Sequence, residues 1–265
     1  MRDESSLCKV EGLLLDLDGV VHVGDAPLPG ALEAVARLRK AKLPFRFVTN
    51  TTRRPRRSVA ARLAALGLLV AEDEIFTPAS LMRDQLATRG LAPLLLVHPD
   101  LREDFAGLAE GGDAVVIGDA GEAFTYDGLN RAFRALVHGA DFFALARNRN
   151  FLDQDGELSL DAGGFVVALG YAASREAIVI GKPSPEFFHS AVEALGVPAA
   201  HALMIGDDAE ADISGAIAAG LLGALVKTGK YRDGQEKTLA IPPTLIADDL
   251  PAVVDEILRP RGRRS

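Results

Sequence analysis

Cysteine and tryptophan are nearly absent from this chain of 265 residues, which has one cysteine, Cys8, and no tryptophan. A single cysteine excludes an intramolecular disulfide and a cysteine-based zinc site, and it is typical of a reducing compartment. No run of eighteen apolar residues occurs, and the start MRDESSL is charged where a signal peptide is apolar. The 29 basic and 37 acidic residues leave a net charge of −8, which argues against a general nucleic-acid binder. These absences predict a cytoplasmic protein that has neither a membrane nor a nucleic acid as its partner.

Short apolar runs alternate with helix-period segments along the chain. Each run is apolar on consecutive positions, as strands buried on both faces require. Eight runs predict strands: 12–17, 44–49, 94–98, 114–117, 142–146, 178–180, 202–205 and 222–226. Eight segments predict helices: 31–40, 56–66, 81–89, 129–138, 165–172, 185–195, 209–219 and 252–258. The alternation is typical of βαβ units, so we predict an α/β fold with a doubly wound parallel sheet.

Reactive side chains follow four of the predicted strands. Ligands of doubly wound sheets bind outside the carboxyl ends of the strands, so these ends form the candidate site. The residues found there are Asp16, Asp18, Thr49, Asn50, Lys182, Asp207 and Asp208. The three runs between 94 and 146 end in other residues and form a separate group. We therefore predict a core of residues 1–80 and 182–265, interrupted by a smaller α/β domain inserted at 81–181.

The aspartates predict a cation at this edge of the sheet. Crowded carboxylates repel one another unless a cation lies among them, and oxygen donors alone favour a hard ion such as Mg²⁺ over zinc or copper. Mg²⁺ takes one or two carboxylates, keeps waters and uses substrate phosphate oxygens for the rest. Lys182, Thr49 and Asn50 supply the cation, hydroxyl and amide that a phosphoryl group needs. One aspartate of the Asp16–Asp18 pair can attack phosphorus while the other transfers the proton of the leaving group.

These residues resemble the four motifs of the haloacid dehalogenase (HAD) superfamily of phosphohydrolases. The matching segments are LDLDGV at 15–20, VTN at 48–50, GKP at 181–183, and GDD at 206–208 with Asp212. The segment between the second and third motifs resembles the C2-type α/β cap of NagD-like and 4-nitrophenylphosphatase-like enzymes. The resemblance implies a Rossmann-type core with a cap domain. It also implies a Mg²⁺-dependent phosphatase that hydrolyses a small phosphorylated metabolite (a phosphomonoester, pyrophosphate or a phosphoramidate) through an aspartyl phosphate.

Carried over position by position, the resemblance implies roles for the acidic residues. Asp16 is the expected nucleophile and a Mg²⁺ ligand. Asp18 is the expected general acid and base, with its backbone carbonyl on the metal, and Asp207 is the third protein ligand. Asp208 and Asp212 are expected not to bind the metal directly but to hydrogen-bond to its ligands through water. Such partners orient the ligands, which matters nearly as much as direct contact with the metal.

Other residues are expected to hold the substrate. The resemblance implies that Thr49 and Asn50 bind the phosphoryl oxygens, and that Lys182 neutralises charge on the nucleophile and the phosphate. In the cap, the resemblance favours Asn148 as a contact of the leaving group; the start of the helix after Asp161 is the alternative, and Asp161 is equally well interpreted as a helix cap. The resemblance also implies a homodimer that pairs through the cap.

Two longer segments resemble a narrower group within the superfamily. GKPSPEFF at 181–188 and VKTGKYR at 226–232 are similar to phospholysine phosphohistidine inorganic pyrophosphate phosphatase and its relatives. Animal members of that group carry serine at the position of Asp18. The aspartate here favours ester hydrolysis over a phosphohistidine-type specificity.

Other functions use similar residues. A phosphoacceptor receiver module also combines acids, a threonine and a lysine, but it occupies one small domain, whereas Asp16 and Asp207 lie 191 residues apart. A non-catalytic phosphate-binding or signalling protein on the same fold is the main alternative, against which the complete set of motifs argues. Nothing favours a phosphomutase, and a haloacid dehalogenase does not need the full acidic set. Asn50 and Asp208 are also interpreted as helix caps.

Overall fold

The computed structural model describes residues 7–152 and 157–259 and forms two compact units. The first unit comprises Met1–Thr49, Ala60–Phe76 and Pro185–Ser265, and the second comprises Asn50–Val59 and Thr77–Ser184. The segment expected to be inserted, 81–181, falls within the second unit, which also takes in Asn50 and Lys182. Among the described residues, no helix is long and apolar enough to cross a membrane.

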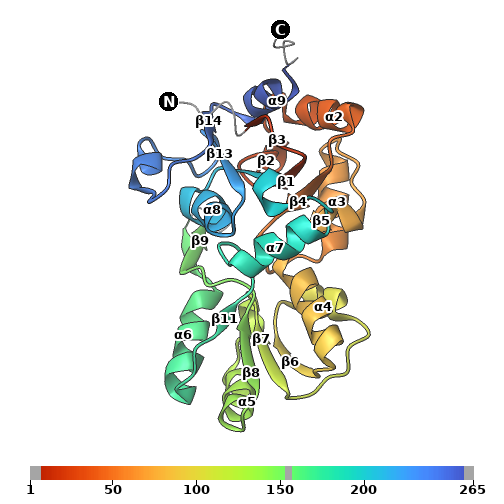
Figure 1. Cartoon of the computed structure of the whole chain (residues 1–265). Coiled ribbons are helices and arrows are strands. Elements are labelled where there is room, and N and C mark those ends of the chain that lie inside the picture. The colour runs from red at the N-terminus through yellow and green to blue at the C-terminus, as the bar shows by residue number, and fades with distance from the viewer. Residues whose placement is uncertain (1–6, 153–156, 260–265) are drawn as a thin grey trace. The chain divides into compact units, whose positions relative to one another are not determined.

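The first unit is built on a six-stranded parallel sheet with the order β14-β13-β12-β1-β4-β5 (Figure 1). Its strands are β1 (Gly12–Asp16), β4 (Phe45–Val48), β5 (Ile75–Phe76), β12 (Ala202–Gly206), β13 (Leu222–Val226) and β14 (Leu245–Ala247). From β1 the chain adds β4 and β5 on one side, whereas β12, β13 and β14 follow on the other. The strand order therefore reverses between β1 and β12, which is where doubly wound sheets bind ligands.

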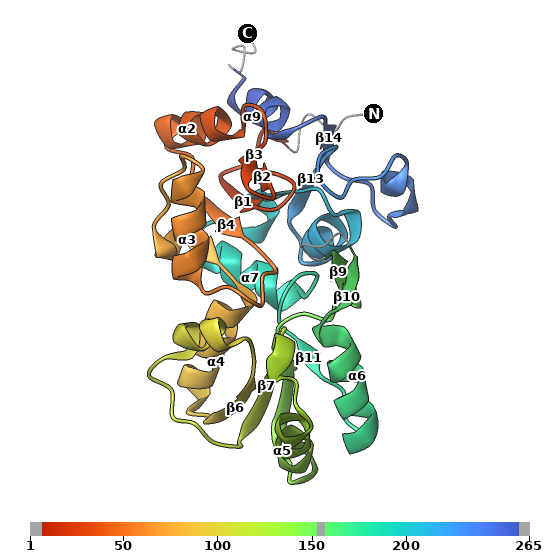
Figure 2. The same cartoon turned by 180° about the vertical axis from the view of Figure 1, so that it is seen from behind.

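Helices cover both faces of this sheet, which makes it doubly wound. They are α2 (Ala31–Ala41), α3 (Arg56–Ala65), α7 (Pro185–Glu193), α8 (Gly215–Ala218) and α9 (Leu250–Leu258). The opposite views of Figures 1 and 2 show α7 and α8 on one face and α3 on the other. In α2 the buried residues Ala31, Ala34, Val35 and Leu38 follow the helical period and so form a single apolar stripe. A small antiparallel hairpin, β2 (His22–Val23) and β3 (Ala26–Pro27), follows β1.

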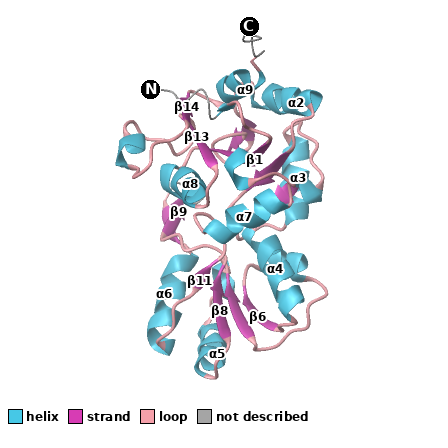
Figure 3. Cartoon of the chain, in the orientation of Figure 1, coloured by secondary structure: helices cyan, strands magenta, loops and turns pink. Residues whose placement is uncertain are grey.

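The second unit has a four-stranded parallel sheet of its own, with the order β11-β8-β7-β6. Its strands are β6 (Pro93–Leu96), β7 (Ala114–Ile117), β8 (Asp141–Ala144) and β11 (Ile178–Val179). Its helices, drawn in cyan in Figure 3, are α4 (Pro78–Arg89), α5 (Tyr126–Val137) and α6 (Ala162–Ala173). An antiparallel hairpin of β9 (Asn150–Leu152) and β10 (Leu158–Leu160) precedes α6.

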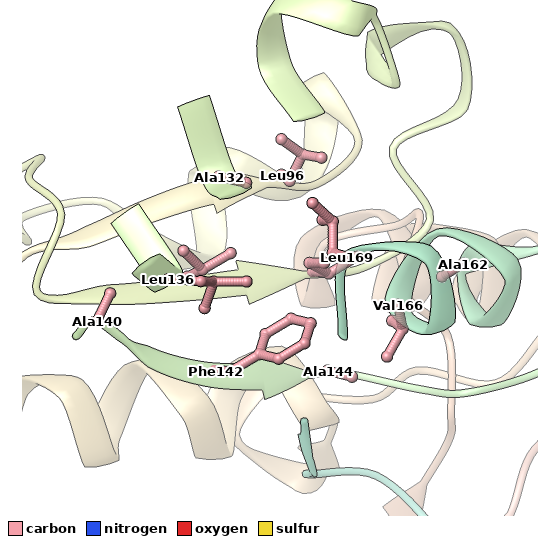
Figure 4. Close-up of a cluster of buried hydrophobic side chains, with 11 residues drawn as sticks. Leu96, Ala132, Leu136, Ala140, Phe142, Ala144, Ala162, Val166 and Leu169 are labelled. Carbon is pink, nitrogen blue, oxygen red and sulfur yellow. The ribbon is translucent and has the colours of Figure 1, made fainter. Parts of the chain in front are cut away.

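A separate hydrophobic core stabilises the second unit (Figure 4). Phe142 of β8 and Leu96 of β6 pack in it with Leu136 of α5 and with Val166 and Leu169 of α6. Burying a side chain of this size contributes about 1.5–3 kcal/mol to folding. The second unit therefore has the core that an independent α/β layer needs.

The structure confirms the predicted fold class and the order of its main elements. Each of the eight predicted strand runs contains a strand, and seven of the eight predicted helices correspond to α-helices. The eighth, 209–219, was expected as one helix but consists of a π-helical turn, Ala209–Ser214, followed by α8. The run 178–180, which lies inside the predicted insertion 81–181, forms β11, and β11 pairs with β8 in the second unit.

Candidate active site

Three buried carboxylates meet at the carboxyl edge of the first sheet. Asp16 ends β1, Asp207 follows β12, and Asp212 lies in the π-helical turn that comes next. Because β1 and β12 run parallel with Leu15 opposite Ile205, their last residues reach the same level. One carboxylate oxygen from each aspartate lies within 4.8 Å of the others, and the three residues are only 7%, 1% and 1% exposed.

This cluster fits a divalent cation. Carboxylates this close and this deeply buried repel one another strongly, because the protein interior screens charge less than water does. A hard cation reverses the sign of that interaction, and oxygen donors are the ligands that Mg²⁺ and Ca²⁺ take. The donors are therefore of the type that a divalent cation takes, and one oxygen of each lies close enough to the others to share an ion.

Asp18 lies apart from the buried cluster, on the turn that follows β1. Its side chain is 62% exposed, and its Oδ1 is 3.4 Å from Nδ1 of His22. His22 itself is buried, and burial lowers the pKa of its imidazole, although the nearby charge of Asp18 acts in the opposite direction. The exposed position gives the Asp18 carboxyl access to solvent.

Asp207 is fixed by a segment that follows β13. The backbone N–H of Lys230 donates to Asp207 Oδ2 at 2.6 Å, and the Gln235 side chain donates to the Asp207 carbonyl at 3.2 Å. Glycine is required at two positions here, since a Cβ on Gly19 would lie 1.9 Å from Asp207 Oδ2 and one on Gly229 would lie 2.0 Å from it. The carboxylate is thus held between two backbone segments.

The other two acids of the fourth motif have different surroundings. Asp208 caps the π-helical turn by accepting from the N–H groups of Glu210 and Ala211 at 3.1 and 2.9 Å, which confirms its interpretation as a cap. Its Oδ2 also lies 3.8 Å from Nζ of Lys230. Asp212 accepts from the backbone N–H of Asp208 at 3.2 Å, so its buried carboxylate is oriented by the same turn.

Thr49 is the buried residue that follows β4, next to β1 in the first sheet. Its backbone N–H donates to the carbonyl of Phe76 at 3.2 Å. The strand pairing places Asp16 opposite Val48, so Thr49 lies one position beyond Asp16 along the direction of the strands. Val48 and Thr49 of the second motif belong to the first unit, whereas Asn50 is the first residue of the second unit.

Asn50 and Lys182 pair with each other in the second unit. Asn50 Nδ2 donates to the Lys182 carbonyl at 2.8 Å, and the Lys182 N–H donates to Asn50 Oδ1 at 2.9 Å. These bonds tie together two motifs that are 132 residues apart. Lys182 is 6% exposed, and the space around it is tight, because a Cβ on Gly181 would lie 2.6 Å from the carbonyl of Leu145.

The predicted specificity residues of the second unit are also linked. Asp161 caps α6, accepting from the Ala162 N–H at 2.6 Å, which confirms its interpretation as a cap. Burial raises the pKa of the Asp161 carboxyl, and hydrogen bonds from Ala162 and from the Asn148 side chain work against that rise. Asn148 is exposed and lies beyond β8, with its carbonyl accepting from Gly163 at 2.9 Å.

The sequence did not reveal the residues that hold the site together. Thr228 donates its hydroxyl to the carbonyl of Gly19, and Lys230 uses its backbone on Asp207. The segment 226–232 stood out only by its resemblance to a group of phosphatases. Its glycine, after a threonine at the end of a buried strand, is the signal that could have pointed to a close approach of two backbones.

Buried carboxylates lie at the edge of the sheet where the strand order reverses. This arrangement is typical of hydrolases of the haloacid dehalogenase-like class. Residues 13–109 match the family model described as haloacid dehalogenase-like hydrolase, and residues 179–253 match a second model of HAD-like hydrolases. Human haloacid dehalogenase-like hydrolase domain-containing protein 2 is 43% identical over 251 residues, which cover 94% of this chain and 96% of the relative. The chain therefore belongs to the haloacid dehalogenase-like hydrolase family.

Further relatives indicate the subgroup. The rat phospholysine phosphohistidine inorganic pyrophosphate phosphatase is 41% identical over 260 residues, covering 96% of each chain. The structure of 4-nitrophenylphosphatase from Thermotoga maritima matches with a TM-score of 0.87 and 26% identity, covering 94% of this chain and 98% of that one. The magnesium complex of a glycerol phosphate phosphatase from Mycobacterium tuberculosis matches with a TM-score of 0.83 and 30% identity, covering 94% and 77%. NagD from E. coli shares the fold as well, with a TM-score of 0.84 and 21% identity.

Proposed function

We propose that this protein is a Mg²⁺-dependent phosphatase that hydrolyses a small phosphorylated metabolite through an aspartyl phosphate on Asp16. The observation that carries the proposal is the buried cluster of Asp16, Asp207 and Asp212 at the carboxyl edge of the first sheet. The names of the relatives support the reaction, because they include phosphatases of nitrophenyl phosphate, glycerol phosphate and pyrophosphate.

The proposed metal ligands are the carboxylates of Asp16 and Asp207 and the backbone carbonyl of Asp18. When bound, Mg²⁺ neutralises the carboxylates and the phosphate, and so lets an anionic nucleophile approach an anionic substrate. Asp212 and Asp208 orient the site through the turn after β12, where one carboxylate oxygen of Asp212 lies within 4.8 Å of one from Asp16 and one from Asp207. The magnesium complex of the relative from Mycobacterium tuberculosis supports this choice of ion.

In the first step the Asp16 carboxylate attacks phosphorus, and the bond between phosphorus and the leaving oxygen breaks. Asp18 gives its proton to that oxygen, so the leaving group departs as an alcohol. The product is a phosphoryl group bound to an oxygen of Asp16. The exposed position of Asp18, two residues beyond the buried Asp16, supports this division of roles.

In the second step Asp18 takes a proton from water, and the water oxygen attacks phosphorus. The bond between phosphorus and the Asp16 oxygen breaks, which releases inorganic phosphate and restores the Asp16 carboxylate. A positioned acid and base of this kind contributes about 10²–10⁴-fold to the rate. The same carboxyl serves both steps, since it is left ionised by the first and protonated by the second.

Thr49, Asn50 and Lys182 are proposed to bind the phosphoryl group. The Thr49 hydroxyl and the Asn50 amide offer hydrogen-bond donors, and the Lys182 ammonium offsets the charge that develops on the equatorial oxygens. Asn50 uses one amide N–H on the Lys182 carbonyl, and an amide nitrogen carries a second. Asn148 is proposed to contact the leaving group.

Asp18 favours a phosphomonoester as the substrate, because an ester oxygen needs a proton as it leaves. We also propose that the protein works in the cytoplasm as a homodimer that pairs through the second unit. A small phosphorylated substrate is its expected partner, and neither a nucleic acid nor a membrane is expected. The net charge of −8 agrees with the absence of a polyanionic partner.

Phosphate release from a panel of compounds tests the proposal. The panel contains 4-nitrophenyl phosphate, glycerol phosphate, phosphoglycolate, sugar phosphates, nucleotides, pyrophosphate and a phosphoramidate, each with Mg²⁺ or with a chelator. We expect release that needs Mg²⁺ and that is lost in Asp16→Asn but retained in the control Asp255→Asn, an exposed acid of α9 that pairs with Arg37. Mg²⁺ binding by a folded protein that releases phosphate from no compound would favour the non-catalytic alternative.

A further inference from the structure

The segment after β13 reaches the site from a strand that carries none of the four motifs. β13 lies beside β12 in parallel, with Leu225 opposite Gly206. Its carboxyl end therefore reaches the same edge of the sheet as the carboxyl end of β12. The residues that follow, Thr228–Lys230, emerge next to Asp207.

This segment contacts both the turn of Asp18 and the carboxylate of Asp207. The Thr228 hydroxyl donates to the Gly19 carbonyl, and the next residue but one, Lys230, donates its N–H to Asp207 Oδ2 at 2.6 Å. Between these bonds Gly229 lies against Gly19 so closely that a Cβ on it would be 2.5 Å from the Gly19 Cα.

These contacts control two groups that the chemistry needs in fixed places. A carboxylate with one oxygen bound to a backbone N–H cannot rotate freely, so Asp207 presents its other oxygen in one direction. Asp18 is largely exposed, so the conformation of its turn sets its position together with the contact of its Oδ1 with His22 Nδ1 at 3.4 Å. A misplacement of about 1 Å at a reacting group can cost about a hundredfold in rate.

We propose that Thr228 is a positioning residue, whose hydroxyl holds the Asp18–Gly19 turn against the segment that orients Asp207. The expected effect on kcat rests on the proposed function, whereas the expected effect on ion binding does not. Thr228 is not among the residues proposed to bind the substrate or the ion. It acts through Gly19 on one side and through the adjoining Gly229 and Lys230 on the other.

Thr228→Val tests the inference, because it removes the hydroxyl and keeps the branched shape. The matched control is Thr244→Val, since Thr244 is also half-buried and its hydroxyl accepts from the Gly223 N–H at the other end of β13. Thr228→Ser restores a hydroxyl at the same place. For each protein we would measure kcat and KM on the best substrate of the panel, Mn²⁺ binding by electron paramagnetic resonance, and Tm.

Loss of one hydrogen bond predicts a kcat about tenfold lower for Thr228→Val, with a smaller change in KM and weaker Mn²⁺ binding. Thr228→Ser should restore kcat and Mn²⁺ binding, and Thr244→Val should lower Tm alone. The inference is wrong if Thr228→Val binds Mn²⁺ and turns over like the wild type, or if Thr244→Val shows the same losses. An inactive wild type would refute the proposed function instead, and the Mn²⁺ measurements would still decide the role of Thr228.

Discussion

Replacing Gly19 by alanine should disable the site by pushing Asp207 out of place. A Cβ on Gly19 would lie 1.9 Å from Asp207 Oδ2 and 3.1 Å from the Gly229 Cα. Real Cβ contacts do not fall below about 3 Å, so the carboxylate must move by about 1 Å, and such a displacement can lower the rate about a hundredfold. The carboxylate cannot simply turn aside, because the Lys230 N–H holds it at 2.6 Å.

Gly220→Ala separates this clash from ordinary backbone strain. Gly19 has φ +83° and Gly220 has φ +84°, but a Cβ on Gly220 would meet nothing within 4 Å. Alanine in this left-handed conformation costs about 1–2 kcal/mol at either position, which lowers Tm by about 2–4 °C for each kcal/mol. Phosphate release and Mn²⁺ binding should fall only in Gly19→Ala. Normal turnover in Gly19→Ala, or an equal loss in Gly220→Ala, would refute the reasoning.

Three further changes test other parts of the account. Asp18→Asn should lower kcat about 10²–10⁴-fold, because the amide cannot transfer a proton to the leaving oxygen of an ester. The leaving group of 4-nitrophenyl phosphate needs little protonation, so stopped-flow kinetics with this compound should show a smaller loss of rate. Asp161→Asn should raise Tm near neutral pH, because a carboxyl whose pKa is raised by folding destabilises the folded state above that pKa. The advantage of asparagine should vanish as pH falls below the pKa of the carboxyl in the unfolded chain. A higher Tm for Asp161→Asn that persists at low pH would contradict this explanation. Phe142→Ala should destabilise the second unit by about 3–5 kcal/mol in urea unfolding, whereas Val137→Ala, which is exposed on α5, should change little.

The sequence was sufficient for the fold class and for the position of two buried aspartates at one edge of the sheet. Short runs that are apolar on consecutive positions, such as 12–17 and 202–205, identify buried parallel strands, and adjacent parallel strands bring their carboxyl ends together. That rule predicted a common edge for Asp16 and Asp207, and the structure places both in one cluster. The two-residue strand β5 gives no periodicity, so it could not be predicted.

The supports of the site could not be predicted in the same way. A backbone N–H such as that of Lys230 is common to almost every residue, so the sequence does not mark the one that orients Asp207. The reciprocal bonds between Asn50 and Lys182 depend on a contact between segments 132 residues apart, which local pattern does not contain. Asp212 was expected behind the metal ligands, and only the geometry of the π-helical turn shows how close it comes to Asp16.

Trapping the covalent intermediate tests the central claim most directly. The purified protein would be mixed with radiolabelled substrate and Mg²⁺, quenched in acid within one turnover, and digested for mass spectrometry. The account predicts a phosphoryl group on the peptide that contains Asp16, absent in Asp16→Asn and absent when a chelator is present. Active hydrolysis with no label on Asp16, or with label on another residue, would contradict it.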